Sequence, residues 1–346
     1  MQPVQRLAAA LACALGPCAA WAVAQPPSVL PAEQRSRAES DARPTRPVIT
    51  SVAIVPGARQ VITAGDDHAV RVWSFETGRV VHELKAHDDW VRTLAVSPDA
   101  ATLASAGDDR QITLWQIETG DKIAELPEHP HAIYSLAYRP DGSLLAAGGF
   151  EPTVRVYDAS THEKLLELEA PDADVRSVVF SPDSSALAAA GRDGRIRIWN
   201  LPDGSVARDI VAGPGRIRSL AYLPAGDMLA AAGENRTISV FSTASGELVQ
   251  RLRCPTAKIL SMVVCGDELI ATGGSDNVIR LWDWRAQREA DRLVGHTGSV
   301  AALAFDAASN RIVSGGFDTT VRVWNLDRVP RGQNTASGVT DEPRVR

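Results

Sequence analysis

Acidic side chains and histidines are the residues of this sequence whose chemistry could serve catalysis or metal binding. Asp108 and Asp109 are adjacent, and paired carboxylates can share a proton in acid–base catalysis or ligate a cation. His129 and His131 lie two residues apart, and imidazole is a common zinc ligand. A catalytic group is needed once, whereas a turn residue recurs with its turn. The first question is therefore whether these groups recur.

The acidic pair belongs to a unit that occurs seven times. An aromatic residue closes an alternating apolar run at steps of 42, 42, 42, 42, 41 and 42 residues; these aromatics are Trp73, Trp115, Tyr157, Trp199, Phe241, Trp282 and Trp324. Six residues before them stand Asp67, Asp109, Glu151, Asp193, Asn235, Asp276 and Asp318. A period near 40 residues is typical of propellers and solenoids. The acidic pairs are therefore predicted to be scaffold.

Each unit divides into four short strands separated by turn residues. In the second unit the predicted strands are 91–96, 102–106, 111–116 and 122–126. Asp, Gly, Pro and Ser between them suit tight turns, and the strands leave no room for crossover helices. Four strands cannot bury their own two faces, but sheets packed in a ring bury one another. We predict an all-β, seven-bladed β-propeller of four-stranded antiparallel blades over residues 47–328.

These units resemble the WD-repeat family of β-propellers. Trp282-Asp283 matches the family's Trp-Asp dipeptide, and Gly295-His296 its Gly-His pair. In that family the turn Asp bonds a His, the His bonds a Ser or Thr, and this hydroxyl meets the Trp indole. The resemblance implies two complete structural tetrads: His87, Ser105, Asp109, Trp115 and His296, Ser314, Asp318, Trp324. His129 occupies the same register in a unit that has Ala147 in place of the hydroxyl, so its structural role is favoured over zinc binding.

Catalytic motifs are missing elsewhere in the sequence. It contains no Gly-x-Ser-x-Gly elbow and no phosphate-binding glycine loop followed by Lys. We therefore expect no enzyme activity, no catalytic residue, no metal and no cofactor.

Departures from the repeat mark candidate binding residues. Phe150 and Phe317 are aromatic residues at turn positions, and Trp90 begins an innermost strand. Two positions after the start of an innermost strand stand Arg92, Tyr134, Arg176 and Arg218. The resemblance implies that the rings lie on the narrower face around the channel mouth. Trp, Tyr and Arg are enriched in interface hot spots, although each side chain could instead pack on a neighbouring loop.

Two functions from different classes remain open. The favoured one is a non-catalytic scaffold that binds a protein or peptide partner, as a monomeric propeller within a larger complex. The alternative is a propeller enzyme or a binder of a small anionic ligand, with Arg92, Tyr134, Arg176 and Arg218 at the channel mouth. The net charge of −6 argues against nucleic acid as the main partner.

The N-terminal residues 1–24 are typical of an export signal. Arg6 precedes an apolar run from Leu7 to Val23, and Ala22-Val23-Ala24 suits cleavage. We expect a periplasmic or secreted protein without stable membrane insertion after signal removal; a membrane anchor and acylation at Cys18 are the alternatives. Cys254 and Cys265 flank one predicted strand and are expected to be unpaired.

The segments outside the repeats are expected to be a linker at residues 25–46 and a flexible tail at 329–346. The stretch after Trp324 lacks an apolar run and contains Pro330, so the seventh blade is short of its outer strand. We predict that residues 28–30 of the linker, Ser-Val-Leu, donate that strand; a disordered linker is the alternative.

Overall fold

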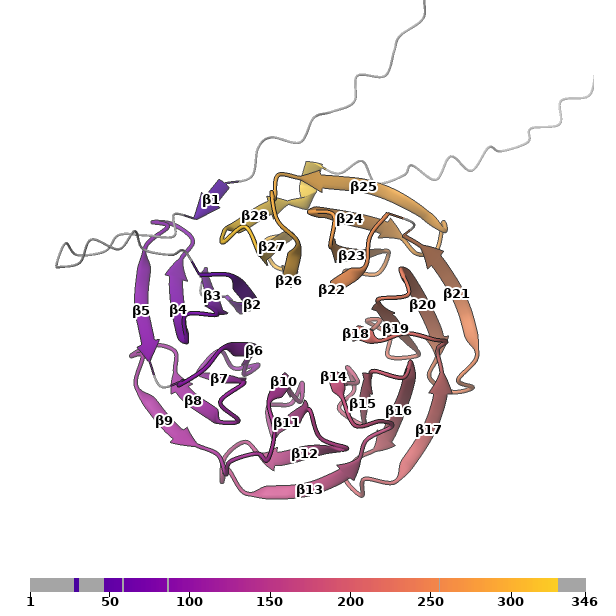
Figure 1. Ribbon diagram of the computed structural model, residues 1–346, viewed down its shortest axis with the longest axis horizontal. Helices are drawn as coiled ribbons and strands as arrows, with labels where there is room; N and C mark the ends of the chain where they lie inside the picture. The colour runs from indigo at the N-terminus through magenta and orange to yellow at the C-terminus, as the bar shows by residue number, and fades with distance from the viewer. Residues whose placement is uncertain (1–27, 31–46, 58, 86, 255, 329–346) are drawn as a thin grey trace, which may run out of the picture.

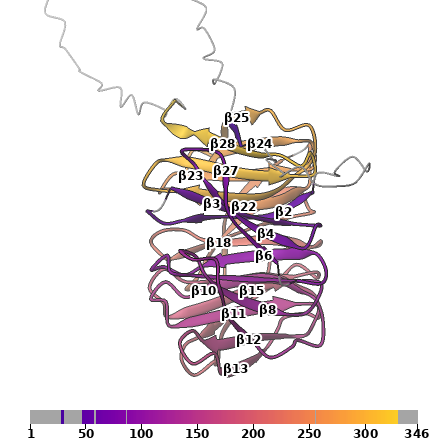
Figure 2. The same cartoon turned by 90° about the vertical axis from the view of Figure 1, so that its left-hand side faces the viewer.

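Seven four-stranded antiparallel sheets stand around a common axis, as the prediction of a seven-bladed propeller requires (Figure 1). The structure is a computed structural model that describes residues 28–30, 47–57, 59–85, 87–254 and 256–328. Seen from the side, the strands run across a flattened disc from one face to the other (Figure 2). The fold prediction is confirmed.

The blades follow one another in chain order, each built from the channel outward. The first four blades are β2 (Ile49–Val55), β3 (Gln60–Gly65), β4 (Ala69–Ser74) and β5 (Val80–Lys85); β6 (Val91–Val96), β7 (Thr102–Gly107), β8 (Ile112–Gln116) and β9 (Lys122–Glu125); β10 (Ile133–Tyr138), β11 (Leu144–Gly149), β12 (Thr153–Asp158) and β13 (Lys164–Glu169); β14 (Val175–Phe180), β15 (Ala186–Gly191), β16 (Arg195–Asn200) and β17 (Val206–Val211). The last three are β18 (Ile217–Tyr222), β19 (Met228–Gly233), β20 (Thr237–Ser242) and β21 (Leu248–Arg253); β22 (Ile259–Cys265), β23 (Leu269–Gly274), β24 (Val278–Asp283) and β25 (Arg288–Val294); β26 (Val300–Asp306), β27 (Arg311–Gly316) and β28 (Val321–Asn325) with β1 (Ser28–Leu30). A short 3₁₀ turn, η1 (Leu326–Arg328), follows β28.

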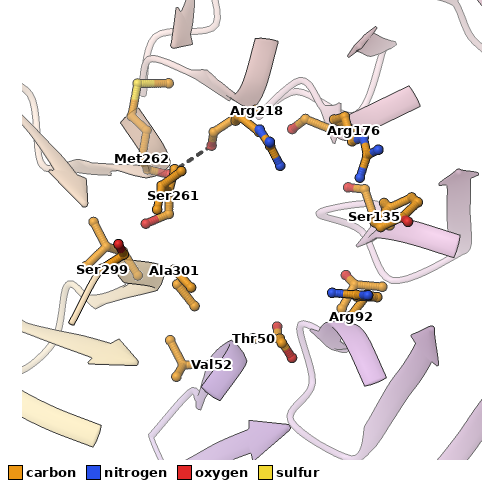
Figure 3. A pocket seen from close by; sticks show the side chains of 18 of the residues that line it. Thr50, Val52, Arg92, Ser135, Arg176, Arg218, Ser261, Met262, Ser299 and Ala301 are labelled. Carbon is orange, nitrogen blue, oxygen red and sulfur yellow. Dashed lines mark hydrogen bonds between the residues drawn. The ribbon is translucent and has the colours of Figure 1, made fainter. Parts of the chain in front are cut away.

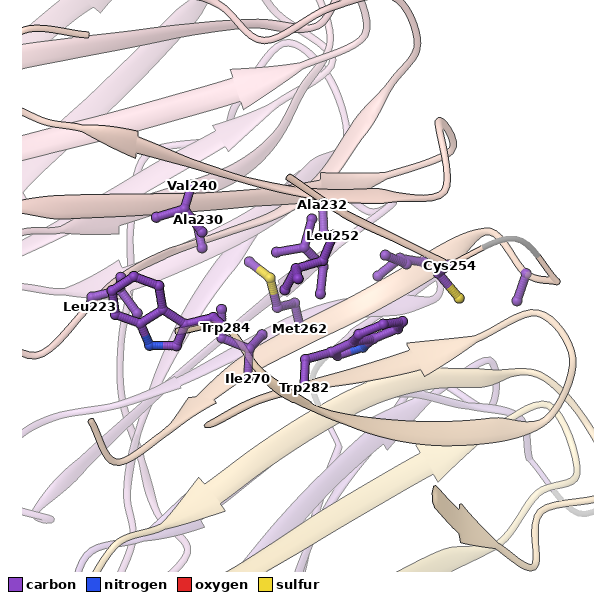
Figure 4. Packing of buried hydrophobic residues seen from close by; sticks show 13 residues of the cluster. Leu223, Ala230, Ala232, Val240, Leu252, Cys254, Met262, Ile270, Trp282 and Trp284 are labelled. Atoms are coloured by element: carbon purple, nitrogen blue, oxygen red, sulfur yellow. The ribbon is translucent and has the colours of Figure 1, made fainter. Parts of the chain in front are cut away.

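The hydrophobic core consists of seven clusters, each between two neighbouring blades. Between the fifth and sixth blades, Leu252 and Val240 pack against Met262 and Trp282 (Figure 4). Trp282, the repeated aromatic of the sixth blade, belongs to the same cluster as the small residues Ala230 and Ala232 of the fifth. Because each sheet buries both faces in this way, the ring is stabilised as a whole and not blade by blade.

The ring closes through the N-terminal strand, as predicted. β1 pairs antiparallel with β28, with Ser28 opposite Val323 and Leu30 opposite Val321. Beside it, Ile49 and Trp73 of the first blade share a core cluster with Val313 of the seventh. The first and last parts of the propeller are therefore joined both by a shared sheet and by apolar packing.

The remaining predictions about the ends of the chain concern residues outside the described ones. These are the export signal at 1–24, most of the linker at 25–46 and the tail at 329–346. Among the residues that the structure describes, no helix has the length and apolar character needed to cross a membrane. Cys254 and Cys265 are both buried as free thiols, and burial raises the pKa of Cys265 to about 12.

Candidate functional site

The two predicted tetrads are joined by hydrogen bonds in the structure. In the second blade, Nδ1 of His87 lies 2.6 Å from Asp109 and its Nε2 lies 2.7 Å from the Ser105 hydroxyl. The indole N–H of Trp115 donates to that hydroxyl at 2.8 Å. His296, Ser314, Asp318 and Trp324 repeat this arrangement in the seventh blade. In each of these two blades the histidine thus joins the segment before the first strand to the turn between the second and third strands.

The third blade forms a shorter version of the same network. Nδ1 of His129 lies 2.7 Å from the Glu151 carboxylate, and its Nε2 lies 2.8 Å from the Tyr157 hydroxyl. Tyr157 therefore supplies both the ring and the hydroxyl that Trp and Ser supply elsewhere. His129 is buried with both ring nitrogens engaged, which supports its structural role. The described residues contain no group of three or more His, Cys, Asp or Glu side chains that could hold a metal ion.

The carboxylates of Asp108 and Asp109 have different roles. Asp109 joins the tetrad, whereas Asp108 accepts hydrogen bonds from Nε and Nη2 of Arg92 at 3.0 and 2.5 Å. Gly107 makes this possible: a Cβ there would lie 1.9 Å from the Trp90 carbonyl oxygen, which accepts the Asp108 N–H at 2.9 Å. The close backbone approach thus seats Asp108 beside Arg92, where its carboxylate holds the arginine side chain.

A β-bulge in each innermost strand aims one side chain at the channel. In the second blade the pairing shifts between Val91 and Thr93, which leaves Arg92 as the extra residue. All seven blades share this shift, and the bulged residues are Thr50, Arg92, Tyr134, Arg176, Arg218, Leu260 and Ala301. Bulges commonly redirect a side chain at functional sites. Long polar side chains thus occupy the second to fifth blades, and small or apolar ones the rest.

The bulged residues surround a cavity of about 690 Å³ at the channel mouth. Figure 3 shows Arg92, Arg176 and Arg218 on one side of the opening, and Ala301, Val52 and Thr50 on the other. The charged side chains that line it are Arg92, Arg176, Arg218, Lys258 and Glu234. Four cations and one anion give the cavity wall a positive excess.

Aromatic rings hold two of these arginines in place. The Arg92 guanidinium lies 4.4 Å from the centre of the Trp90 ring, and that of Arg176 lies 3.8 Å from Tyr134 and 4.9 Å from Phe150. Tyr134 and Phe150 meet edge to face at 5.3 Å. Cation–π stacking restricts these side chains without neutralising their charge. Five of the seven candidate residues therefore form one contiguous row, which we call the arginine–aromatic row: Trp90, Arg92, Tyr134, Arg176 and Phe150.

Arg218 is connected to this row through a chain of ion pairs. Asp174, which is buried, lies 2.5 Å from Arg176 and 3.2 Å from Arg216. Glu234 forms ion pairs with both Arg216, at 3.3 Å, and Arg218, at 2.6 Å. The Arg218 hydrogen bonds lower the pKa of Glu234, and Arg216 and Lys258 add to this effect. On Arg92, burial opposes the charge, but the bonds to Asp108 raise its pKa overall.

The two turn phenylalanines lie on opposite rims of the mouth. Phe150 precedes β12 in the third blade, and Phe317 lies between β27 and β28 in the seventh (Figure 1). Phe317 is 53% exposed and lines the cavity, and Phe150 is 43% exposed. Trp90 is partly exposed. Phe317 is thus separated from the arginine–aromatic row by the cavity itself.

Hydroxyl groups beneath the arginines tie consecutive blades together. The Thr93 hydroxyl accepts the Leu136 N–H at 3.1 Å, and the Ser135 hydroxyl accepts the Val178 N–H at 3.0 Å. Ser177 does the same for Leu220. Each bond joins one inner strand to the next, so the bulged residues project from a rigid wall.

Comparison with known proteins agrees with this architecture. The family model described as IFT122 first beta-propeller matches residues 48–325. The chain is 35% identical over 69 residues to the U3 snoRNP-associated protein-like EMB2271 of Arabidopsis thaliana, which is 20% of this chain and 14% of that protein. It is 30% identical over 93 residues to Topless-related protein 1 of Arabidopsis thaliana (24% of this chain, 8% of that protein). It is 38% identical over 74 residues to Protein FIZZY-RELATED 2 of the same plant (21% of this chain, 15% of that protein).

Each of these pairwise matches covers less than a sixth of the relative's own length. The family model, in contrast, runs from the residue before β2 to the end of β28. The chain therefore belongs to the WD-repeat β-propellers that the IFT122 first beta-propeller family model describes.

Proposed function

We propose that this protein is a non-catalytic interaction platform that binds a protein or peptide partner on its channel-mouth face. The observation that carries the proposal is that five of the seven departures from the repeat line one cavity, while the other two, Trp90 and Phe150, stack on its arginines. Tryptophan, tyrosine and arginine in a well-ordered setting are the residues that dominate binding energy in protein interfaces. The inter-blade hydrogen bonds beneath them keep these groups in place before binding, which lowers the entropic cost of association.

A pair of matched surface variants tests the proposal. Phe317→Ser removes a 53%-exposed ring at the mouth, and Val206→Ser removes an apolar side chain of similar exposure, 52%, on the outer strand β17. We expect Phe317→Ser to abolish capture of partners that the unaltered protein retains, while Val206→Ser leaves capture unchanged. Quantitative mass spectrometry of the captured proteins gives the measurement. Loss of capture in Val206→Ser alone would contradict the proposal.

The second part of the proposal is export, which rests on the sequence of residues 1–24. An apolar run after Arg6 and the small residues Ala22 and Ala24 are features of a cleavable signal. We expect the exported protein to begin at Gln25 and to act in the periplasm or outside the cell, as a monomer within a larger complex. N-terminal sequencing of the exported fraction tests this, and a chain that still begins with Met1 would contradict it.

The small-ligand alternative has one observation in its favour, which is the positive cavity wall. Against it, the two exposed phenylalanines, Phe150 and Phe317, would remain uncovered by a small anion. A partner that covers both rims satisfies these observations better.

A further inference from the structure

The charge of the cavity wall indicates which kind of partner the proposed platform would bind. Arg92, Arg176, Arg218 and Lys258 face the cavity, with Glu234 as the one acidic lining residue among those described. The carboxylates of Asp108 and Asp174 support the arginines without lining the cavity. An occupant with negative charge would therefore meet an electrostatically complementary wall.

The arginines are held so that part of each guanidinium remains available. Arg92 and Arg218 bind their carboxylates through Nε and Nη2, and Arg176 meets Asp174 through the same two atoms. In the described part of the chain, Nη1 of these three residues makes no hydrogen bond. Figure 3 shows guanidinium nitrogens of Arg92 and Arg218 directed at the opening. A guanidinium fixed on one edge can bind a second carboxylate on its other edge with little loss of side-chain entropy.

Apolar anchors flank this charged wall on two sides. Phe317 lies on the rim of the seventh blade, and Phe150 on the rim of the third, with the cavity between them. A small carboxylate or phosphate could occupy the arginines but would leave both rings in water. A polypeptide segment in extended form can reach both rims while its central side chains enter the cavity.

We propose that the cavity binds an acidic segment of a partner protein, with Asp or Glu carboxylates on Arg92, Arg176 and Arg218 and apolar side chains on Phe150 and Phe317. The inference rests on the proposed platform function and adds the chemical class of the partner segment. Since the interaction is between charges at a partly open mouth, its affinity falls as salt rises.

Fluorescence anisotropy with the full chain tests this inference. The probe is a short labelled peptide in which Glu and Asp alternate with Leu and Phe; its analogue carries Gln and Asn at the acidic positions. We expect the analogue to bind at least about tenfold more weakly, as loss of charge-assisted hydrogen bonds requires. Arg218→Gln leaves Glu234 paired with Arg216. This substitution should also lower the affinity for the acidic peptide by about tenfold.

Two further variants separate binding from folding. Lys258→Gln removes an exposed cavity charge that has no ion pair among the described residues, so we expect it to lower the affinity, by less than Arg218→Gln, while the melting temperature stays unchanged. Arg59→Gln removes the same charge from the β2–β3 turn on the opposite face and should leave the affinity unchanged. Equal affinity for the acidic and neutral peptides, or an unaltered affinity in both Arg218→Gln and Lys258→Gln, would overturn the inference.

Competition identifies the source of the negative charge. Free glutarate should displace the acidic peptide only at concentrations far above that of the unlabelled peptide. Displacement at similar concentrations, or tighter binding of an oligothymidylate of equal charge, would overturn the assignment to a peptide. If Phe317→Ser abolishes partner capture while the acidic peptide shows no advantage over its analogue, the platform function stands and this inference alone fails.

Discussion

The hydroxyl of Tyr157 lies 2.8 Å from Nε2 of His129, in the place where other blades use a serine and a tryptophan together. Burial alone would raise the pKa of Glu151, but the hydrogen bond from His129 and the charge of Arg155 lower it overall. The Glu151 carboxylate can therefore only accept a hydrogen bond. Nδ1 of His129 therefore carries the proton, and in the neutral ring Nε2 accepts from Tyr157. One residue thus completes a network whose expected hydroxyl is replaced by Ala147.

Removing that hydroxyl should destabilise the third blade. Tyr157→Phe leaves Nε2 of His129 buried without a donor, and we expect a loss of about 1–3 kcal/mol in the free energy of unfolding. Tyr222→Phe is the matched control, because the Tyr222 hydroxyl is buried and has no hydrogen-bond partner among the described residues. It should be neutral or stabilising. Urea unfolding of both variants measures these changes in the free energy of unfolding. Equal losses of stability in Tyr157→Phe and Tyr222→Phe would contradict the assigned network.

The tetrad of the second blade should respond in the same way. His87→Ala removes the histidine partner of the Asp109 carboxylate and one of the buried partners of the Ser105 hydroxyl, at a cost of about 1–3 kcal/mol. His131→Ala, at an exposed position outside the register, should shift the melting temperature far less. Similar melting shifts for these two histidines, measured by calorimetry, would show that His87 has no special role.

His296 makes the stability of the propeller depend on pH. Burial lowers its pKa below the ordinary value of about 6.5, although Asp318 acts in the opposite direction. The unfolded chain therefore binds the proton more readily than the folded one, so stability is lost as pH falls below about 6.5. We expect His296→Gln to flatten the pH dependence of unfolding between about pH 7.5 and 5.5 relative to wild type. An identical slope in the two proteins would contradict this mechanism, and His131→Gln is the control.

The closing strand should contribute measurably to stability. Deleting Ser28–Leu30 exposes the edge of β28 and removes its backbone pairing, so we expect a loss on the order of 1–3 kcal/mol and a lower melting temperature. Deleting three residues from the C-terminal segment, 340–342, is the control. An unchanged melting temperature in the first deletion would mean that the seventh blade is stable with three strands.

Repetition made the fold predictable from sequence, and departures from repetition led to the site. The period of the aromatics predicted the number of blades, the match to tetrad positions predicted the His87 network, and the missing apolar run after Trp324 predicted the donated strand. Each of these rests on local patterns that recur. The predicted strands of the second blade differ from the observed ones by no more than one residue at either end.

The partners of the arginines were not predicted, because they depend on how strands and turns meet in space. Asp108, Asp174 and Glu234 look like ordinary turn or strand-end residues in the sequence. A signal was present nonetheless: Arg92–Asp108 and Arg218–Glu234 are both pairs separated by 16 residues. The bulge that aims these arginines inward is a shift in pairing between the first two strands of each blade, which the pattern of apolar residues in a repeat does not show.

The central claim is that the mouth face, and not the outer strands, contacts the partner. The most direct measurement is site-specific photo-cross-linking in the exported fraction, with a photoreactive residue at Phe317 or, separately, at Val206 of β17. The account predicts that the Phe317 probe forms a discrete cross-linked complex, which Arg218→Gln weakens, and that the Val206 probe forms none. Cross-links to the same partner from Val206 with none from Phe317 would contradict it.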